Sequence, residues 1–562
     1  MAGRQGPHGT PRRGNGPAER SGRRGGDEDP HRTLSSGHEA AFWADEEVKL
    51  LQPGRPHVVR DSKTPSGPVP ISGLRGPIIS DALFRTFKAN ALDVRFVYTI
   101  DDYDPMDSQS MKERAGMAAH MGKPLCMIPS PDPSVGTDFA DYHATRFIAL
   151  FAGLGITPEF HRMRDLYRSG ALDKQIDLVL RNAETIRAIH KRVANVDHPE
   201  GWLPVAVICE NCGRIGTTLA TDYDGTTVAY ECKPDYVEWA KGCGHKGRLA
   251  PFKGNAKLLW NEQWCAQWDH FGVTYEEGGK DLLTAGGSRE RSNEIYREVW
   301  KRDPPPGLQH EFFTFGGKKM ASSKGIGAEA VEIVAIYPPE VVRFLMLRTH
   351  PKRHLEFDPA GMTLPRLMDE YDRAADAYRG DEESDLGKTW RLSQVSPTPD
   401  APGFRIRFTT VASWLQIPSI KPEAEAEKEK GARLTDAELR DLHRRVELAR
   451  AWLERWAPDE AKFEVLERTP DVELTPEQRR YLSAIRALIG TVHDAGEMQN
   501  QLYEAAKQVG LLDAKGKPSQ DAFAAIYLAF LGKPNGPRAG WLLLSIDADR
   551  VRRRLDDFGR AP

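Results

Sequence analysis

One short segment of the sequence, residues 316–325, combines cations with a flexible backbone: GGKKMASSKG. Its glycines permit hinge motion, so that Lys319 and Lys324 could approach a polyphosphate from a loop that closes. Lysine suits that task because its ammonium group is a compact charge on a mobile stem. The segment is therefore a candidate phosphate-handling loop, and a solvated basic turn is the alternative interpretation.

A second group of residues has the spacing of metal ligands. Four of the six cysteines lie in one segment, and the first two form a C-x-x-C pair: Cys209, Cys212, Cys232 and Cys243. Such a pair lets two thiolates bind one tetrahedral ion from a tight turn. We predict a structural zinc site, in which His245 is a possible replacement for one thiolate. Four unrelated buried cysteines are the alternative.

The elements that position such residues begin with a strand–helix–strand pattern. HVVR and VRFVYTI are typical of strands, and GLRGPIISDALFRTFKANAL between them is typical of a helix. This βαβ unit implies a parallel sheet, and ligands bind beyond the carboxyl ends of the strands of such sheets. TPSGPVPISG follows the first strand and DDYDPMD follows the second, so both segments fall on the expected binding edge.

Composition excludes several classes of function. The chain has 562 residues, which suggests about three or four domains. No apolar run approaches the ~20 residues that span a bilayer, and the N-terminus lacks the apolar region of a secretory signal. Six cysteines do not form a disulfide framework in a chain of this length, which indicates a cytoplasmic location. The net charge of −3 leaves no global basic field, so any nucleic-acid-binding face must be a local patch. We expect neither a membrane nor DNA as a partner.

Shifts in composition divide the chain into segments. Residues 1–38 are predicted to be a disordered tail, because they contain too few large apolar side chains to offset ordering entropy. Two later stretches, GDEESDLGKTWRLSQVSPTPDAPG and KPEAEAEKEKGAR, are predicted linkers. The other expected segments are an α/β domain at 39–200 and 254–316, a Cys-rich insertion at 201–253, the basic loop with connecting helices at 317–365, and a helical domain at 366–562.

Taken in their order along the chain, these segments resemble the segments of a known protein family. KMASSKG is similar to the K-M-S-S-S-K-G loop of class I aminoacyl-tRNA synthetases, and SKTPSGPVPISGLRG is similar to their first signature, the nucleotide-binding turn. This loop by itself is typical of the class I synthetases in general and does not identify one amino acid. DDYD and GGKD, together with the Cys-rich insertion, resemble the class I type of lysyl-tRNA synthetase. The resemblance extends from about residue 41 to residue 557.

The resemblance implies a fold and a reaction. The fold is α/β, with a Rossmann-like parallel-sheet catalytic domain, a zinc-binding insertion, and an all-α C-terminal domain that binds the anticodon. In the reaction, the lysine carboxylate attacks the α-phosphorus of ATP to give lysyl-adenylate and pyrophosphate, and a terminal adenosine hydroxyl of tRNA then takes the lysyl group. The implied partners are tRNA, lysine and ATP, with Mg²⁺ and Zn²⁺ as the metal ions.

The resemblance assigns roles to the residues of this sequence that stand at matching positions. Lys319 and Lys324 would neutralise the pyrophosphate as the loop closes, and Ser322 and Ser323 would donate hydrogen bonds to phosphate oxygens. The nucleotide would face the first signature, and the residues there are Gly67, Pro70, Ser72 and Gly73. The residues implied for lysine binding are Asp101, Asp102, Asp104, Trp260, Asp281 and His310. A surface turn for the aspartates and a core position for Trp260 are the alternatives.

The first signature departs from the family pattern. The family reads roughly H-[IV]-G where this sequence has Pro70, Ile71 and Ser72. The family histidine stabilises charge on the α-phosphate, which proline cannot do. Losing one preorganised donor typically lowers the rate ~10²–10³-fold. Three further departures are Leu282 in place of a histidine, His310 in place of a tyrosine and Ala321 in place of a serine. His310 is our candidate for partial compensation.

Three functions follow from these observations. The first is an active lysine–tRNA ligase. The second is a degenerate paralogue that activates an amino acid for another acceptor, and the third is a non-catalytic tRNA-binding relative. The three lysines of the loop argue against the third, because a protein that only binds RNA has no need of them. The helical C-terminal region favours tRNA binding and hence the first over the second.

Overall fold

The computed structural model describes residues 42–114, 116–315, 318–319, 329–396, 401–417 and 420–559. The predicted tail at 1–38 and most of the basic loop at 316–325 lie outside the described residues. Among the described helices, none combines the length and the apolar character that crossing a membrane requires.

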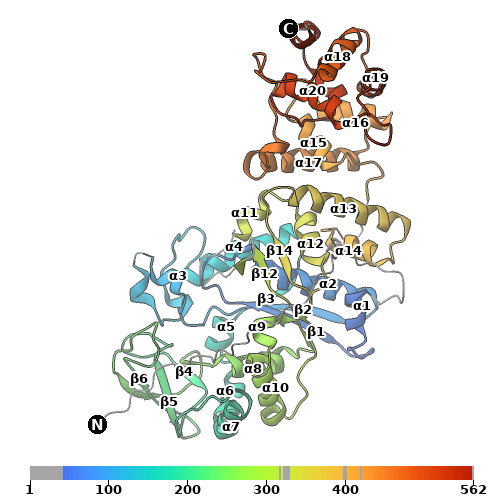
Figure 1. The fold of residues 1–562 in the computed structure, drawn as a ribbon. Coiled ribbons are helices and arrows are strands. Elements are labelled where there is room, and N and C mark those ends of the chain that lie inside the picture. The colour runs from blue at the N-terminus through green and yellow to red at the C-terminus, as the bar shows by residue number, and fades with distance from the viewer. Residues whose placement is uncertain are drawn as a thin grey trace, which may run out of the picture. The chain divides into compact units, whose positions relative to one another are not determined.

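A parallel sheet forms the centre of the α/β region, with the strand order β3-β2-β1-β9 (Figure 1). Its strands are β1 (His57–Lys63), β2 (Val94–Ile100), β3 (Glu159–Arg162) and β9 (Tyr275–Glu276). β1 and β2 pair along their whole lengths, from His57 opposite Val94 to Lys63 opposite Ile100. The predicted parallel βαβ unit is thus confirmed, and its helix is α2 (Arg75–Ala89).

Successive side chains of the central strands enter two different hydrophobic cores, because neighbouring residues of a strand face opposite sides of the sheet. Val59 and Phe96 pack in the core that contains α2. Val58 and Val97 pack in the second core with Trp264 of helix α8 (Trp260–Phe271). Figure 1 shows α2 and α8 on opposite faces of the sheet. The sheet is therefore covered on both faces, as parallel sheets are.

Beyond β9, short strands form two small sheets separate from the central one. The paired elements are β10 (Gly278–Gly279) with β11 (Gln309–His310), and β12 (Phe313–Phe315) with both β13 (Lys318–Lys319) and β14 (Leu355–Phe357). The β10–β11 and β12–β14 pairs are parallel, whereas β12 and β13 are antiparallel. β12 thus leads directly into the basic loop at 316–325.

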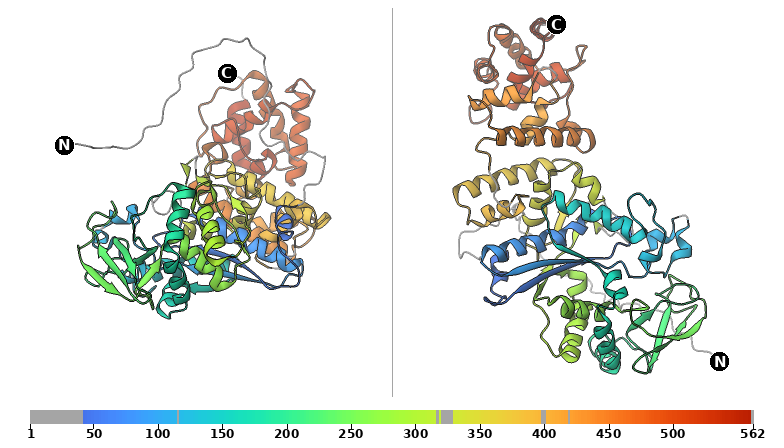
Figure 2. Two further views of the ribbon diagram at one scale, coloured as in Figure 1. Left: turned by 90° about the horizontal axis from the view of Figure 1, so that it is seen from below. Right: turned by 180° about the vertical axis from the view of Figure 1, so that it is seen from behind.

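The Cys-rich segment forms small antiparallel sheets of its own. Its strands are β4 (Val205–Val207), β5 (Thr218–Tyr223), β6 (Val228–Cys232) and β7 (Lys246–Leu249), followed by β8 (Ala256–Leu258). β5, β6 and β7 form one sheet, and β4 pairs with β8. Both views in Figure 2 show these green strands apart from the blue strands of the parallel sheet. We refer to residues 201–253 as the Cys-rich module.

The remaining helices of the α/β region surround these sheets. They are α1 (Trp43–Val48), α3 (Gln109–Lys112), α4 (Phe139–Gly153), α5 (Met163–Arg168), α6 (Asp173–Arg181), α7 (Ala183–Ala194), α9 (Lys280–Leu283), α10 (Ser288–Ile295), α11 (Ala330–Val334) and α12 (Pro339–Leu347). The connecting helices predicted after the basic loop correspond to α11 and α12. Pro339 occupies the first turn of α12, where its missing N–H is no loss.

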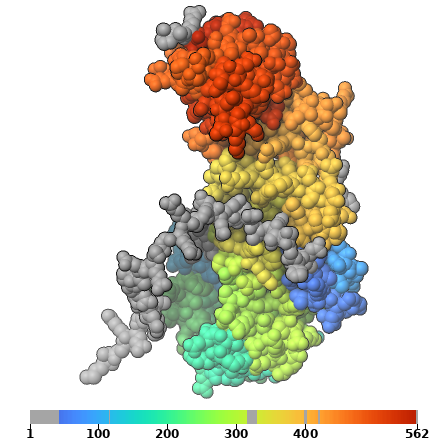
Figure 3. All heavy atoms as spheres, turned by 45° about the vertical axis from the view of Figure 1, so that its right-hand side comes forward, coloured from blue at the N-terminus to red at the C-terminus, as the bar shows by residue number. Residues whose placement is uncertain are grey.

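The residues described after β14 form helices and short turns. The helices are α13 (Thr363–Gly380), α14 (Asp385–Ser393), α15 (Phe408–Trp414), α16 (Pro422–Lys430), α17 (Asp436–Arg455), α18 (Pro476–Ile485), α19 (Ala495–Gln508), α20 (Gln520–Leu531), α21 (Ala539–Ser545) and α22 (Ala548–Gly559). Thr435 and Glu438 form a capping box that begins α17. In Figure 3 the atoms of the orange-to-red residues of this part are packed closely together.

The prediction of two linkers was wrong for part of each stretch. KPEAEAEKEKGAR forms α16, because its residues are strong helix formers, Pro422 stands in the first turn and Gly431 ends the helix with φ +74°. The other stretch contains α14. There the hydroxyl of Ser384 accepts a hydrogen bond from the backbone N–H of Gly387, and Trp390 is buried. The burial of Trp390 stabilises the helix in spite of the polar residues around it.

A buried ion pair connects the elements of the sheet. Arg60 of β1 lies opposite Glu276 of β9, and its guanidinium donates to the Glu276 carboxylate at 2.5 Å. Arg60 also donates to Thr99 of β2 and to Gln267 of α8. The second carboxylate oxygen of Glu276 accepts from the indole N–H groups of two α8 tryptophans, Trp264 and Trp268. One pair of charges therefore links three strands and a helix.

We predict that Glu276→Gln destabilises the protein by about 3–5 kcal/mol, because it leaves the buried Arg60 charge without its anionic partner. The matched control is Glu159→Gln, which breaks an exposed ion pair with Arg95 on the same sheet and is expected to change stability by less than about 1 kcal/mol. Urea unfolding followed by tryptophan fluorescence measures both. Equal losses in the two variants would contradict the prediction.

Candidate active site

The first signature connects β1 to α2 through a tight turn. Gly67 has φ +155°, a conformation that L side chains rarely adopt. Gly73 packs so closely on Val69 that an added Cβ would lie 2.4 Å from the Val69 Cγ1 atom, and its N–H donates to the Pro70 carbonyl at 2.8 Å. Pro70 is buried and Ser72 is half-buried. The turn is compact, and its backbone leads directly into α2.

The described residues before and after the basic loop contact other strands or the first signature. At the start, Lys319 in β13 lies opposite Thr314 of β12. After the loop, Glu329 forms a β-bridge with Pro70, and the N–H of Ala330 donates to the Val69 carbonyl at 2.8 Å. The structure thus brings together two segments that are far apart in the sequence. Ser322, Ser323 and Lys324 lie outside the described residues.

Arg75, the first residue of α2, holds the base of the loop. Its buried guanidinium donates to the backbone carbonyls of Phe312, Pro351 and Arg353 at 3.2, 3.2 and 3.0 Å. Burial lowers the pKa of Arg75 to about 10. Because Phe312 immediately precedes β12, these bonds fix the strand that leads into the loop relative to the N-terminus of α2.

A cavity of about 440 Å³ opens between the carboxyl edge of β1 and β2 and the Cys-rich module. The sheet edge contributes Thr64, Ser66, Asp104, Pro105 and Asp107. The module side and its flanks contribute Trp202, Leu203, Val205, Ala206, Ile215, Gly216, Thr218, Ala220, Tyr236, Trp239, Lys257, Leu259 and Trp260. Of the residues implied for lysine binding, Asp104 and Trp260 line this cavity.

The three aspartates after β2 differ in their partners. Asp104 pairs with the ammonium of Lys257 at 2.9 Å and accepts from the Thr64 hydroxyl at 2.8 Å. Asp102 is fully buried and accepts from the backbone N–H and the Nε of Arg164 at 2.8 and 2.6 Å. Burial raises its pKa despite this pair. Asp102 therefore joins the end of β2 to α5 inside the protein.

Asp101 lies beneath the edge, in contact with α8. Its Oδ1 accepts from the amide groups of Gln267 at 3.0 Å and Gln263 at 3.3 Å, while the buried Oδ2 has no hydrogen-bond partner. Burial, with a further contribution from nearby Asp104, raises the pKa of Asp101 to about 7. The position of this carboxyl group makes it a link between strand and helix.

A second acidic group lies at the N-terminus of α2. A Cβ added to Gly76 would lie 2.9 Å from Glu277 Oε1 and 3.2 Å from Asp61 Oδ2, so both carboxylates abut the first turn of the helix. Burial and the neighbouring Glu277 hold the pKa of Asp61 well above its ordinary value. His310 of β11 places its Nδ1 atom 2.5 Å from Glu277 Oε2. His310 thus lies beside the start of α2.

Asp281, one of the residues implied for lysine binding, is exposed. A Cβ built on neighbouring Gly279 would lie 2.7 Å from Asp281 Oδ1 and 3.5 Å from His310 Nε2.

Sequence reasoning did not single out several residues near these groups. Glu277 directly follows β9 at the binding edge, and that position was the available signal for it. Lys257 and the tryptophans of the Cys-rich module carried no comparable signal, because only folding brings the module to the sheet edge.

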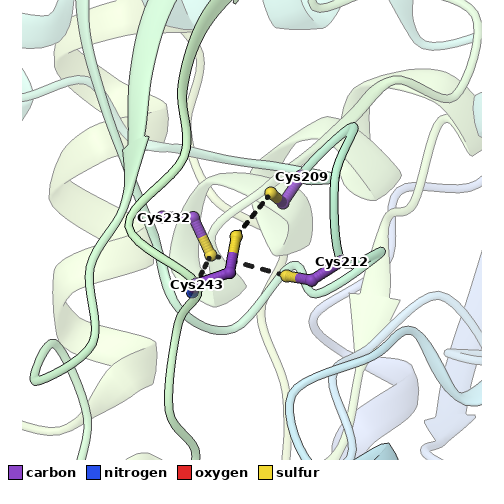
Figure 4. Close-up of side chains that lie close together, drawn as sticks. All are labelled: Cys209, Cys212, Cys232 and Cys243. Atoms are coloured by element: carbon purple, nitrogen blue, oxygen red, sulfur yellow. Dashed lines mark hydrogen bonds between the residues drawn. The ribbon is translucent and has the colours of Figure 1, made fainter.

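The four cysteines of the Cys-rich module converge on one point (Figure 4). Their sulfur atoms all lie within 4.8 Å of one another, with 3.6 Å between Cys209 and Cys243 and 3.6 Å between Cys212 and Cys232. Four thiolates on a tetrahedral ion with ~2.3 Å bonds would stand ~3.8 Å apart. The geometry therefore fits one thiophilic metal ion. His245 is not among the grouped ligands, and its ring lies near Tyr230.

Comparison with known proteins places the chain in a family. A family model described as "tRNA synthetases class I (K)" matches residues 41–396. The lysine–tRNA ligase of Archaeoglobus fulgidus is 32% identical over 517 residues, covering 91% of this chain and 99% of that protein. The lysine–tRNA ligase of Thermoplasma acidophilum is 31% identical, covering 92% of this chain and 98% of that protein. The chain belongs to the class I lysyl-tRNA synthetases.

A solved glutamate tRNA ligase from Elizabethkingia meningosepticum matches 90% of this chain and 99% of its own, at 15% identity and a TM-score of 0.38. So loose a superposition adds nothing to the assignment. In this class I lysyl-tRNA synthetase, the match includes the first signature and the Cys-rich module, and it continues past the basic loop. Pro70 and Ser72, the departures from the family's first signature, lie where the two segments meet.

Proposed function

We infer that this class I lysyl-tRNA synthetase is a lysine–tRNA ligase, which activates lysine with ATP and transfers it to the 3′ end of tRNA. One observation carries the conclusion: the chain that follows the lysine-rich loop pairs, at Glu329 and Ala330, with the backbone of Pro70 and Val69 in the first signature. A nucleotide bound at the first signature would therefore have the basic loop beside its phosphates, at the N-terminus of α2.

The residues of the chain would act by positioning and by stabilising charge. A carboxylate oxygen of lysine attacks the α-phosphorus, and the bond to the departing pyrophosphate breaks. Lys319 and Lys324 would neutralise that pyrophosphate, while Ser322 and Ser323 donate hydrogen bonds to its oxygens. A terminal adenosine hydroxyl of tRNA then attacks the lysyl carbonyl carbon and releases AMP. ATP enters this reaction as its Mg²⁺ complex.

The metal and domain assignments are part of the same proposal. Cys209, Cys212, Cys232 and Cys243 would hold one Zn²⁺ that fixes the Cys-rich module at 201–253. Thr217 places its hydroxyl 3.2 Å from the Cys232 sulfur, and the residues on either side of it, Gly216 and Thr218, line the cavity. The ion would therefore support one wall of the cavity. The helices within 366–562 would form the anticodon-binding part.

Removing one thiolate should remove the metal. We expect Cys209→Ala to lose most of its zinc, because a structural zinc site requires all four ligands. The matched control is Cys126→Ala, which removes a buried cysteine outside the group and should keep one zinc ion per chain. Elemental analysis of purified protein measures both. Full zinc occupancy in Cys209→Ala would refute the ligand set.

Lysine-dependent exchange between pyrophosphate and ATP tests the function. Of the twenty amino acids, lysine should support the fastest exchange. Lys319→Ala and Lys324→Ala should each lower kcat about a hundredfold with little change in lysine affinity, because these charges act on the transition state. The control is Lys515→Ala, which removes an exposed lysine from the turn before α20. Wild-type rates in both loop variants would show that the loop is only a surface turn.

The altered first signature favours a second candidate, a degenerate paralogue that activates an amino acid for another acceptor. Pro70 offers no donor to the α-phosphate, and it is buried against the end of the basic loop. Charging of a tRNA pool separates the two functions. A chain that supports lysine-dependent exchange but charges no tRNA would be the paralogue, and a chain that supports no exchange would be a non-catalytic relative.

Restoring the family residues tests what the departures do. In an active ligase working below its family's rate, the double variant Pro70→His with Ser72→Gly should raise kcat for adenylate formation about a hundredfold, or ~3 kcal/mol. A slower double variant would instead indicate a site rebuilt around Pro70. In that case His310, which stands beside α2 with its Nδ1 on Glu277, is the expected donor. Unchanged adenylate formation in His310→Ala would exclude it.

A further inference from the structure

A fully buried carboxylate, Glu262, lies in the first turn of α8. Among the described residues its one ion pair is with His190 of α7, whose Nε2 atom lies 3.1 Å from Glu262 Oε1. Neither oxygen of Glu262 accepts a hydrogen bond from another described residue. A buried carboxylate is costly unless it is paired. His190 is therefore placed to offset the charge of Glu262.

The other ring nitrogen of His190 continues this chain of contacts. His190 Nδ1 lies 2.8 Å from Nε2 of His198, in the segment after α7. Two ring nitrogens at this distance share one proton, because one nitrogen must donate and the other must accept. With a further proton on His190 Nε2, facing Glu262, the carboxylate sets the tautomer of both rings. We refer to Glu262, His190 and His198 as the Glu–His–His relay.

The relay ends on the wall of the 440 Å³ cavity, at Trp202. The His198 ring stacks on the Trp202 indole with 3.7 Å between ring centroids and 7° between planes. The His190 ring lies against the same indole, with 5.7 Å between centroids. The position of Trp202 in the wall therefore depends on two rings that are themselves held by Glu262.

The relay can hold one proton more than its basic form. When Nδ1 of His198 is bare, both rings are neutral and the relay has the single negative charge of Glu262. When solvent adds a proton to His198 Nδ1, the shared proton can move to His190, which becomes an imidazolium beside Glu262. The half-buried His198 thus connects solvent to a carboxylate that solvent does not reach. Because the rings are coupled, this proton titrates as a property of the pair, in the usual histidine range of about pH 5–8.

Charged groups on the neighbouring elements act on the relay in both directions. Burial, and after it the neighbouring His190, lowers the pKa of His198. Arg291 of α10 adds to this effect on the pKa, whereas Glu262 and Asp197 oppose it. Other charged groups on the packed helices form ion pairs of their own, which are Lys191 with Asp197, Arg192 with Glu294 and Glu298, Arg187 with Glu184, and Arg289 with Glu276.

We propose that the Glu–His–His relay positions Trp202 in the cavity wall and couples that position to one proton. With the extra proton, the contact between His190 and Glu262 is an ion pair and the contact to His198 has a charged donor. Hydrogen bonds of this kind are roughly twice as strong as neutral ones. The relay therefore holds Trp202 most firmly below its titration range and less firmly above it. All three relay residues act through Trp202 and are positioning residues.

NMR of protein labelled with ¹⁵N only in histidine reads the relay without the reaction. The signals that disappear in His198→Phe identify the terminal ring, and in the wild type this ring should titrate together with His190. Glu262→Gln keeps the shape of the side chain and an acceptor for His190 but removes the charge. The midpoint of the titration should therefore fall by about one pH unit or more. An unchanged midpoint in Glu262→Gln would overturn the proton coupling.

The KM for lysine in pyrophosphate exchange reads the position of Trp202. This readout rests on the proposed function, because Asp104 and Trp260, which line the same cavity, are residues that the family resemblance implies for lysine binding. His198→Ala removes the stacked ring and should raise KM about three- to tenfold at every pH. His198→Phe keeps a ring without nitrogens, so it should recover most of this loss while its KM no longer rises with pH as the wild-type KM does.

The matched control is His493→Phe, the same change at an exposed histidine before α19, which should leave both KM and its pH profile as in the wild type. Asp101 also titrates near this range, with a pKa of about 7, but its contribution is the same in every variant. A wild-type KM in His198→Ala would overturn the positioning of Trp202. A wild-type pH profile in His198→Phe would overturn its link to the proton.

Failure of the relay and failure of the ligase function give different results. If the wild type supports no lysine-dependent exchange, the ligase function fails, and the histidine titration still decides whether the relay exists. If exchange is normal and Glu262→Gln titrates like the wild type, the relay is wrong and the ligase function stands.

Discussion

The buried ion pair between Arg60 and Glu276 is the constraint on which the α/β region depends. Two charges inside a sheet are costly unless good pairing geometry and further hydrogen bonds offset their lost hydration. Here those partners come from β2 and from α8, so satisfying the charges fixes the helix against the sheet. Because α8 also carries Trp260 at its first residue, the same network places one wall of the cavity.

Asp101 extends this dependence to the carboxyl edge. Gln267 accepts from Arg60 through its carbonyl oxygen and donates to Asp101 through its amide nitrogen. One side chain thus connects the ion pair in the middle of the sheet to the first residue after β2. The adjacent Asp102 is held by Arg164 in the same way. These buried contacts leave the later residues of the segment, Asp104 and Asp107, facing the cavity.

Opposite charges are distributed along the carboxyl edge in a way that suits the proposed reaction. The carboxylates of Asp104 and Asp107 line the cavity between the sheet and the Cys-rich module, whereas the loop that begins at β13 contains lysines. An ammonium-bearing substrate and a polyphosphate could therefore occupy neighbouring parts of one edge without sharing a binding surface. The first signature lies between them, since Gly67 follows the cavity residues Thr64 and Ser66 and Pro70 contacts the end of the loop.

The sequence by itself determined the features that depend on local pattern. β-branched and aromatic residues gave β2 its bounds, and the C-x-x-C pair with two later cysteines identified four sulfur atoms that the fold brings together. Only the tertiary structure decided which carboxylates line the cavity. Asp101, Asp102 and Asp104 are equivalent in the sequence, but their partners, Gln267, Arg164 and Lys257, come from distant segments. A sequence pattern records the spacing along one strand or helix, whereas the availability of a charge depends on which other charges packing places beside it.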